Sequence, residues 1–121
     1  MDCPFCNLSP ERIKAENALA ILLYDLYPVS EGHSLAIPKR HVSSYFDLTN
    51  EELLAMNELI GVRKNELLKR GSSDFNIGVN IGENSGQTVF HCHMHLIPRF
   101  KGDVENPKGG VRGVIPSKQS Y

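Results

Sequence analysis

The sequence predicts an α+β fold, in which helices lie on one side of an antiparallel β-sheet of about five strands. Three observations point to it: short runs with strand character come early, one long amphipathic helix follows, and two alternating runs come after that helix. A length of 121 residues suffices for a hydrophobic core without disulfides. We therefore expect a single domain, residues 1–121, with an extended tail from about residue 100.

The N-terminal part of the chain indicates one short helix and two strands. Ser9 and Pro10 suit a helix start, because serine caps a first turn and proline fits its first position. The apolar residues 19–24 predict a strand. Pro28 and Gly32 then break the chain before a second strand, over about residues 34–37.

The one long helix is predicted from its end signals and its periodicity. Thr49 and Glu52 match a capping box, whose side chains satisfy backbone amides that a helix start leaves unpaired. Apolar residues recur at helical spacing over residues 53–68, and Lys69 and Gly71 provide the cation and the glycine of a helix end. The apolar stripe should therefore pack on the sheet.

Two alternating runs after this helix predict a hairpin. Residues 75–81 and residues 88–97 each alternate apolar with small or polar side chains, and Pro98 should stop the second strand. The loop between the runs is short, so the two strands should pair antiparallel. Glycine and proline become frequent after residue 100, which is typical of an extended tail rather than of packed structure.

Composition and charge exclude several classes of partner. With 13 basic and 14 acidic residues, the formal charge of −1 gives no field that would hold nucleic acid or a membrane surface. The longest apolar run is too short to span a bilayer, and the N-terminus lacks the basic region of a signal peptide. We therefore expect a cytoplasmic protein, in which cysteine thiols stay reduced and serve metal binding or packing.

Three histidines in strict alternation form the strongest candidate site. His91, His93 and His95 should share one face of the predicted strand, because side chains at every second position of a strand point the same way. The residues that alternate with them should face the core: Cys92, Met94 and Leu96. Neighbouring rings would stand about 6.6 Å apart along the strand, so one phosphate group could contact two or three of them.

Two chemistries fit such a row of imidazoles. The rings could contact and attack a phosphate, or they could bind a catalytic zinc ion, with Asp25 or Glu83 folding in as a base. The preceding residues 82–88 favour the first chemistry, because their glycines and short polar side chains suit contact with a phosphate. This loop is not a Walker loop, since Gln87 stands where that motif needs lysine.

Residues 86–99 closely resemble the signature of the histidine triad (HIT) superfamily of nucleotide hydrolases and transferases. The resemblance extends over most of the chain. Tyr24 with Asp25 and residues 32–38 look like the family's earlier nucleotide-site strands, with His33 as its fourth histidine. The resemblance implies the HIT-like fold and a homodimer whose sheets join across a two-fold axis.

The resemblance also implies a reaction and a role for each histidine. His93 would attack the α-phosphate of a nucleotide conjugate and form a nucleotidyl-histidine, which water then hydrolyses to a nucleoside monophosphate. The backbone carbonyl of His91 would orient His93, while His95 would hold phosphate oxygens and His33 would brace the cluster. No metal or organic cofactor is implied for this step. The implied substrate contacts are Asp25 to the ribose, with Asn80, Gln87 and Thr88 to the ribose, phosphate or leaving group.

The pair Cys3 and Cys6 has the spacing of a zinc knuckle but is incomplete alone, because structural zinc takes four ligands. A redox dithiol is the alternative, although that motif usually follows a strand at a helix start. A third interpretation is that both residues are buried, unreactive thiols. Bacterial members of the family look similar here, and that resemblance implies a structural Zn²⁺ held by Cys3, Cys6, His41 and His91.

The substrate is predicted only as a class. Residues 106–116 resemble bacterial members described as diadenosine polyphosphate hydrolases, which favours a dinucleoside polyphosphate such as diadenosine tetraphosphate over an adenylyl-linked amine. Cations of the tail could neutralise extra phosphates or simply be solvated: Arg99, Lys101, Lys108 and Arg112. Two other functions stay open, a metal-dependent hydrolase with the triad as ligands and a non-catalytic nucleotide-binding sensor.

Overall fold

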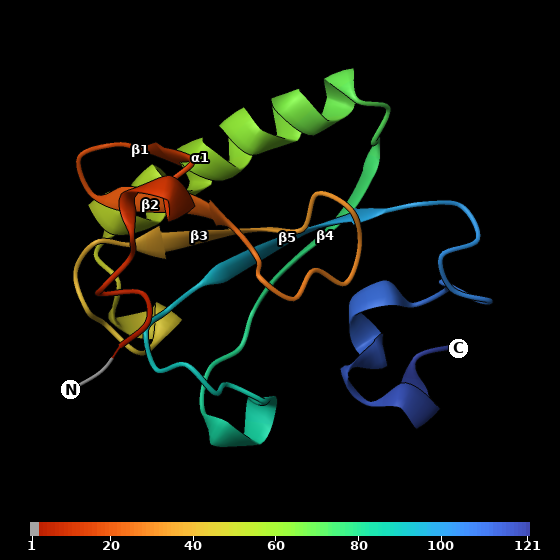
Figure 1. Ribbon diagram of the computed structural model, residues 1–121. Helices are drawn as coiled ribbons and strands as arrows, with labels where there is room; N and C mark the ends of the chain where they lie inside the picture. Colours follow the sequence, from red (N-terminus) through yellow and green to blue (C-terminus); the bar gives the residue numbers. More distant parts are fainter. Residues whose placement is uncertain (1–2) are drawn as a thin grey trace.

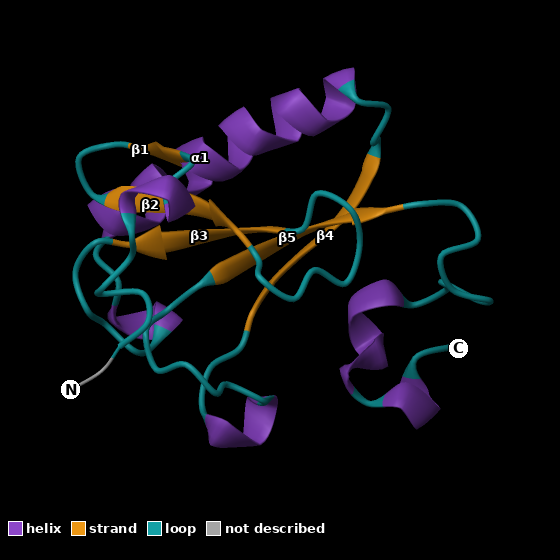
Figure 2. Ribbon diagram, in the orientation of Figure 1, coloured by secondary structure: helices purple, strands orange, loops and turns teal. Residues whose placement is uncertain are grey.

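The structure is a computed structural model that describes residues 3–121. It contains one five-stranded sheet with the order β1-β2-β3-β5-β4, in which all neighbouring strands are antiparallel. The strands are β1 (Ala15–Glu16), β2 (Ala20–Tyr24), β3 (Ser34–Pro38), β4 (Asp74–Val79) and β5 (Met94–Arg99). The long helix α1 (Asn50–Lys69) lies along one face of the sheet (Figures 1 and 2). The predicted α+β fold is confirmed.

Alternation along the strands separates two apolar layers. Leu22 and Ala36 face the helix and pack in a core with Met56 and Ile60 of α1. Leu23, Leu35 and Ile37 point to the other face, where Phe5, Leu8 and Ile21 pack against them. The N-terminal segment therefore covers the face of the sheet that α1 leaves open.

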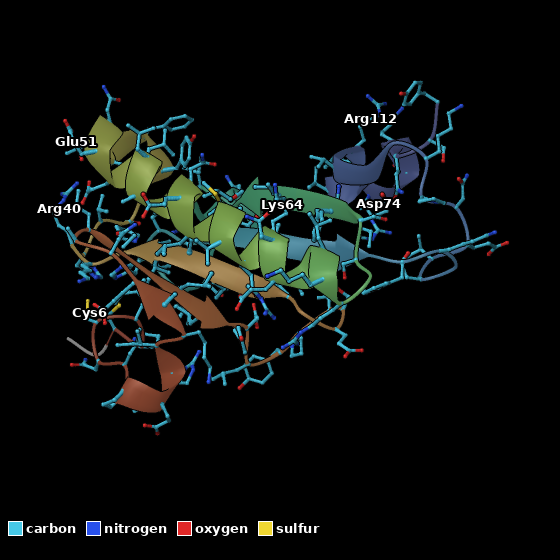
Figure 3. All side chains as sticks on the ribbon, turned by 90° about the horizontal axis from the view of Figure 1, so that it is seen from above. Cys6, Arg40, Glu51, Lys64, Asp74 and Arg112 are labelled. Carbon is cyan, nitrogen blue, oxygen red and sulfur yellow. The ribbon has the colours of Figure 1, made fainter. Side chains whose placement is uncertain are left out.

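The start of α1 follows its predicted capping box. Thr49 Oγ1 accepts a hydrogen bond from the Glu52 amide at 3.0 Å, and Glu52 Oε1 accepts one from the Thr49 amide at 2.9 Å. Arg40 donates to both carboxylate oxygens of Glu52, at 2.8 and 2.9 Å. Figure 3, seen from above, shows α1 lying over the strands, with Arg40 beside its first turns.

The last strand differs from its prediction at both ends. β5 begins only at Met94, so of the three triad histidines only His95 lies in a strand. The segment before it lies against the loop after β3, where the Cys92 amide donates to the Val42 carbonyl at 2.7 Å. Pro98 lies inside β5 rather than ending it. It stands beyond the pairing with β3, so its missing amide costs no ladder hydrogen bond.

The residues after β5, for which the sequence predicts an extended tail, are not extended throughout. They form two short 3₁₀ helices, Gly110–Val114 and Pro116–Lys118, and most of their side chains are exposed. The predicted short N-terminal helix is likewise a 3₁₀ helix, Pro10–Arg12. Within residues 3–121 no helix has the length and apolar character needed to cross a membrane. The extent of the domain, residues 1–121, stays a prediction.

Candidate active site and metal cluster

The histidine row keeps its alternation although most of it precedes β5. The rings of His93 and His95 are half-buried and lie with their centroids 5.1 Å apart. The ring of His91 is fully buried. The residues that alternate with the histidines point into the core under α1, as the alternation predicts: Cys92, Met94 and Leu96.

A backbone carbonyl fixes the protonation of His93. Its Nδ1 lies 2.9 Å from the carbonyl oxygen of His91. Because a carbonyl only accepts hydrogen bonds, the proton of the neutral ring must be on Nδ1, which donates it. Nε2 of His93 therefore carries a lone pair, in a ring that lines a pocket beside the triad.

A chain of hydrogen bonds fixes His33 and His95 in the same way. The amide of Val29 donates to Nδ1 of His33 at 3.1 Å, which puts the proton of this ring on Nε2. Nε2 of His33 lies 2.9 Å from Nδ1 of His95 and donates to it. The proton of His95 must then be on its own Nε2, where it can be donated to a bound oxyanion.

Burial keeps these two rings neutral at physiological pH. Burial, together with nearby His93 and His33, lowers the pKa of His95 to about 4, against the opposing effect of Asp25. Burial also lowers the pKa of His33, although the Asp25 carboxylate, 3.4 Å from its Nε2, opposes this shift. Neutral rings are what the hydrogen-bond chain requires.

The pocket beside the triad has a volume of about 340 Å³ and draws its lining from distant parts of the chain. Asp25, Asn80 and Thr88, three of the predicted substrate contacts, line it together with His93 and His95. Its remaining lining is largely apolar and includes Phe5, Leu26 and Leu35. The pocket thus offers polar contacts at the histidines and an apolar surface from the rest of its lining.

Gln87 is the predicted substrate contact that the structure places elsewhere. Its side chain is buried outside the pocket, where Oε1 accepts from the Gly82 amide at 2.8 Å. Nε2 donates to the carbonyls of Ser43 and Val89, at 3.0 and 3.2 Å. Both ends of the amide are thus used by the backbone, and Gln87 holds the loop that presents Thr88.

The four residues predicted to bind zinc do come together. Nδ1 of His41 and Nδ1 of His91 lie 3.2 Å apart, and Sγ of Cys6 lies 3.2 and 3.5 Å from these two nitrogens. Sγ of Cys3 lies 3.5 Å from Nδ1 of His91. All four ligand atoms fall within 4.8 Å of one another.

These distances fit a tetrahedral zinc ion. Zinc bonds of about 2.3 Å to sulfur and about 2.05 Å to nitrogen separate two nitrogens by about 3.3 Å and nitrogen from sulfur by about 3.6 Å. His91 also donates from Nε2 to the Pro38 carbonyl at 2.8 Å, which leaves a lone pair on Nδ1 for a metal. The residue types and their protonation therefore suit Zn²⁺.

The structure does not bring the triad together as a set of metal ligands. A second group with ligand atoms within 4.8 Å consists of Asp25, His33 and His95, which the hydrogen bonds above already link. In residues 3–121, neither of the two groups contains more than one triad histidine. A catalytic metal held by His91, His93 and His95 is therefore not supported.

Arg63 supports the site from the opposite face of the sheet. Its side chain on α1 is only 2% exposed, and Nε donates to Ser34 Oγ at 2.9 Å. Its guanidinium lies 4.2 Å from the centre of the Tyr24 ring. Tyr24 and Ser34 are paired in register, and the next residues in the loop are Asp25 and His33. Arg63 thus clamps the hairpin end from which both site residues emerge.

Three of the four tail cations have partners in the structure. Arg99 donates to Asp103 at 2.8 Å and to Asn76 at 2.6 Å. The cations of Lys108 and Arg112 lie over the ring of Tyr121. None of these cations lines the pocket beside the triad, and neither does Lys101.

Phe5, Arg12 and Arg63 are the site residues that the sequence did not reveal. Phe5 and Arg12 line the pocket from a segment without periodicity, so no pattern marks them. Arg63 could have been found, because it interrupts the apolar stripe of α1 between Ile60 and Leu67. A cation at such a position is buried and needs partners.

The family model for the HIT domain matches residues 8–102, most of the chain. The chain belongs to the HIT family. Among its relatives, an uncharacterised HIT-like protein of Methanocaldococcus jannaschii is 36% identical over 89% of this chain and 87% of its own length.

Two relatives of this HIT protein have enzyme names. Adenylylsulfatase HINT3 of Arabidopsis thaliana is 36% identical over 84% of this chain and 54% of its own length. Adenosine 5'-monophosphoramidase hnt1 of Schizosaccharomyces pombe is 33% identical over 82% of this chain and 75% of its own length. The family therefore includes hydrolases of adenosine nucleotides.

Two solved structures resemble this HIT protein in fold. A Zn-bound histidine triad family protein from Mycobacterium smegmatis has a TM-score of 0.71 and 29% identity, over 81% of this chain and 72% of that one. Diadenosine triphosphate hydrolase of Plasmodium falciparum also has a TM-score of 0.71, with 26% identity over 82% of this chain and 68% of that one.

Proposed function

We propose that this HIT protein hydrolyses a nucleotide conjugate at its α-phosphate and releases a nucleoside monophosphate. The observation that carries the proposal is the 2.9 Å hydrogen bond from His93 Nδ1 to the His91 carbonyl. It leaves the Nε2 lone pair of His93 free in a ring that lines the pocket. A neutral imidazole held in this way is an activated nucleophile without a separate base.

The reaction has two steps. Nε2 of His93 attacks the α-phosphorus, a bond from nitrogen to phosphorus forms, and the bond from phosphorus to the leaving group breaks. Water then attacks the nucleotidyl-histidine, which releases the monophosphate and restores the ring. His95 donates from Nε2 to the phosphoryl oxygens, where negative charge is spread in the transition state.

The other predicted residues take positions consistent with substrate binding. Asp25 would accept from the ribose hydroxyls, while Asn80 and Thr88 would donate to the phosphate, since all three line the pocket. His33 holds the tautomer of His95 through their 2.9 Å contact. Gln87 acts indirectly, by holding the loop before Thr88.

The substrate we propose is an adenylyl conjugate, either a dinucleoside polyphosphate or an adenylyl-linked amine. The names of the relatives support both, because they include a monophosphoramidase and a diadenosine triphosphate hydrolase. The tail does not add support for extra phosphates, since Arg99 and Arg112 already have partners. The homodimer and the cytoplasmic location stay predictions.

We propose further that Cys3, Cys6, His41 and His91 hold a structural Zn²⁺, for which their distances and protonation are suited. Such an ion would crosslink the N-terminal segment to the loop after β3 and to the triad. Held there, it would have a structural role and would take no part in the phosphoryl transfer. The chain's own residues that act on the substrate lie around the neighbouring pocket.

The test compares wild type with His93→Ala and with His93→Gly supplied with free imidazole. Each is incubated with diadenosine polyphosphates and adenosine phosphoramidate, and the products are separated by chromatography. We expect wild type to release AMP, His93→Ala to lose at least about 10³-fold in kcat, and imidazole to restore part of the activity of His93→Gly. Mass spectrometry after alkaline quenching should detect adenylylated His93 in wild type.

Two outcomes would overturn this proposal. Activity that disappears with a chelator while the fold, followed by circular dichroism, stays intact would indicate a catalytic metal. Tight nucleotide binding without turnover of any substrate in the panel would indicate a sensor.

A further inference from the structure

The two cysteines of the metal cluster enclose a turn that also forms a wall of the pocket. The turn is closed by a hydrogen bond of 3.1 Å from the Cys6 amide to the Cys3 carbonyl. Pro4 and Phe5, the two residues between the cysteines, both line the pocket that contains His93. The metal ligands and the pocket wall are therefore parts of a single turn.

Phe5 makes the contacts that connect the two sites. Its ring lies edge-on to His91, with centroids 5.9 Å apart, and edge-on to His93, with centroids 5.3 Å apart. It also packs against the apolar cluster that contains Leu35, another residue of the pocket lining. Phe5 thus contacts a metal-cluster ring, the nucleophile ring and the pocket at once.

Little else attaches this turn to the sheet. Among residues 3–121, the backbone of residues 3–13 forms hydrogen bonds only within that segment. The first backbone hydrogen bond to the sheet runs from the Lys14 amide to the Leu22 carbonyl, at 2.9 Å. What holds Phe5 in place is the packing of apolar side chains and the cluster of Cys3, Cys6, His41 and His91.

We propose that Phe5 is a nucleotide-contacting residue placed by the metal cluster, so that Zn²⁺ binding and nucleotide binding strengthen each other. An aromatic ring beside Leu26 and Leu35 offers a flat apolar wall, which suits a nucleobase. An ion bound by Cys3 and Cys6 on either side of the ring fixes it before the nucleotide arrives. This inference rests on the proposed function, because it needs the pocket to take a nucleotide.

Coupling of this kind is reciprocal. If Zn²⁺ tightens nucleotide binding by some factor, the nucleotide must tighten Zn²⁺ binding by the same factor. Couplings between sites in proteins usually amount to about 5-fold to 150-fold. Contact through a single aromatic ring places our expectation near the lower end, at about 10-fold.

The first arm of the test measures nucleotide affinity by calorimetry. AMP is titrated into the full chain, loaded with Zn²⁺ or stripped of it, and GMP, CMP and UMP are titrated in parallel because the base is unidentified. We expect loading to tighten the best of the four by about 10-fold in wild type. Phe5→Ala should bind this nucleotide more weakly, with equal affinity in the loaded and stripped forms, while still binding one Zn²⁺ per chain.

The matched control is Phe100→Ala. This phenylalanine is 41% exposed, directly follows β5 and lines neither the metal cluster nor the pocket of the triad. The substitution Phe100→Ala also removes a phenyl ring, but away from both sites. The coupling between Zn²⁺ and nucleotide binding in this variant should therefore equal that of wild type.

The second arm runs in the reverse direction and needs no stable metal-free protein. Zn²⁺ transfer from the loaded protein to a chromogenic chelator is followed with and without saturating nucleotide. We expect the nucleotide to slow this transfer by about 10-fold in wild type and in Phe100→Ala, and to leave it unchanged in Phe5→Ala. This arm decides the proposal if the stripped protein unfolds.

The outcomes separate this inference from the proposed function. Equal nucleotide affinity with and without Zn²⁺, together with equal Zn²⁺ transfer rates, would overturn the inference and leave the hydrolase intact. Coupling that survives in Phe5→Ala would overturn the role of Phe5. Coupling without any turnover of substrates would support the inference while the proposed reaction fails.

Discussion

Nε2 of His33 lies 2.9 Å from Nδ1 of His95, and this contact orders the protons of the candidate site. It makes the protonation state of one ring depend on the other. Both rings have lowered pKa values, mainly because they are buried, and the pKa of His95 falls to about 4.

The first prediction concerns these pKa values, measured by NMR titration of the imidazole signals. His33→Ala should raise the pKa of His95, because it admits water to the buried ring and removes the Nε2 donor that stabilises the neutral form of His95. Asp25→Asn should lower the pKa of His33 further, because the carboxylate opposes its downward shift. A lowered pKa of His95 in His33→Ala, or a raised pKa of His33 in Asp25→Asn, would contradict this arrangement of the three residues.

The lowered pKa values also predict how stability depends on pH. In the unfolded chain a histidine titrates at about pH 6.5, so between that pH and about pH 4, the pKa of His95 in the folded chain, the unfolded state binds more protons. The contribution of His95 is therefore fully present above about pH 6.5 and is lost as the pH falls towards 4. Urea denaturation should show this slope in wild type and a smaller slope in His95→Asn.

The third prediction separates a structural glutamine from a substrate contact. Gln87→Ala should lower the free energy of unfolding by about 2 kcal/mol, because it leaves backbone groups of the loop unpaired. Thr88→Val should leave stability within about 0.5 kcal/mol of wild type and raise KM. The opposite pattern, stability lost in Thr88→Val and only KM affected in Gln87→Ala, would show that Gln87 contacts the substrate.

The fourth prediction concerns the buried cation behind the site. Arg63→Met keeps most of the side-chain volume but cannot bind Ser34, so kcat should fall by about 10-fold through displaced Asp25 and His33. Combining it with Ser34→Ala should cost little more than either change alone. Lys64→Met, on the exposed side of the same helix (Figure 3), is the control and should match wild type. Additive losses in the double variant would refute the clamp.

A fifth prediction uses two glycines with the same backbone conformation. Gly32 has φ +95° and Gly71 has φ +96°, so alanine is strained at both. A Cβ at Gly32 would also lie 2.7 Å from Leu67 Cδ2, whereas Gly71 faces open space. Gly71→Ala should cost about 1 kcal/mol and Gly32→Ala about 1–3 kcal/mol more, by urea denaturation. Equal costs would show that α1 does not press on the turn before His33.

Features set by neighbouring residues were predictable from the sequence. The capping box of Thr49 and Glu52 involves residues three apart, and the structure forms both of its hydrogen bonds. The alternation around the triad gave the correct faces even though the strand starts late. Extended backbone alternates its side chains whether or not it is paired.

Features set by distant parts of the chain were not predictable from the residues alone. Cys3 and His91 are 88 positions apart, and only the resemblance to a family suggested that they meet. The start of β5 depends on the contact of Cys92 with Val42, and the place of Gln87 depends on Ser43. Nothing in the local pattern around these residues specifies such partners.

The backbone and the side chain of His91 serve different sites: its carbonyl accepts from His93, the proposed nucleophile, and its imidazole belongs to the group of proposed zinc ligands. Every amino acid has a carbonyl, so the first position of the triad is exchangeable in a way that the second is not. A cysteine at position 91 could keep both the carbonyl contact to His93 and a side chain that binds a metal, whereas an apolar residue could keep only the carbonyl contact. The proposed chemistry therefore depends on the side chains of His93 and His95, whereas the side chain of His91 serves the proposed zinc site.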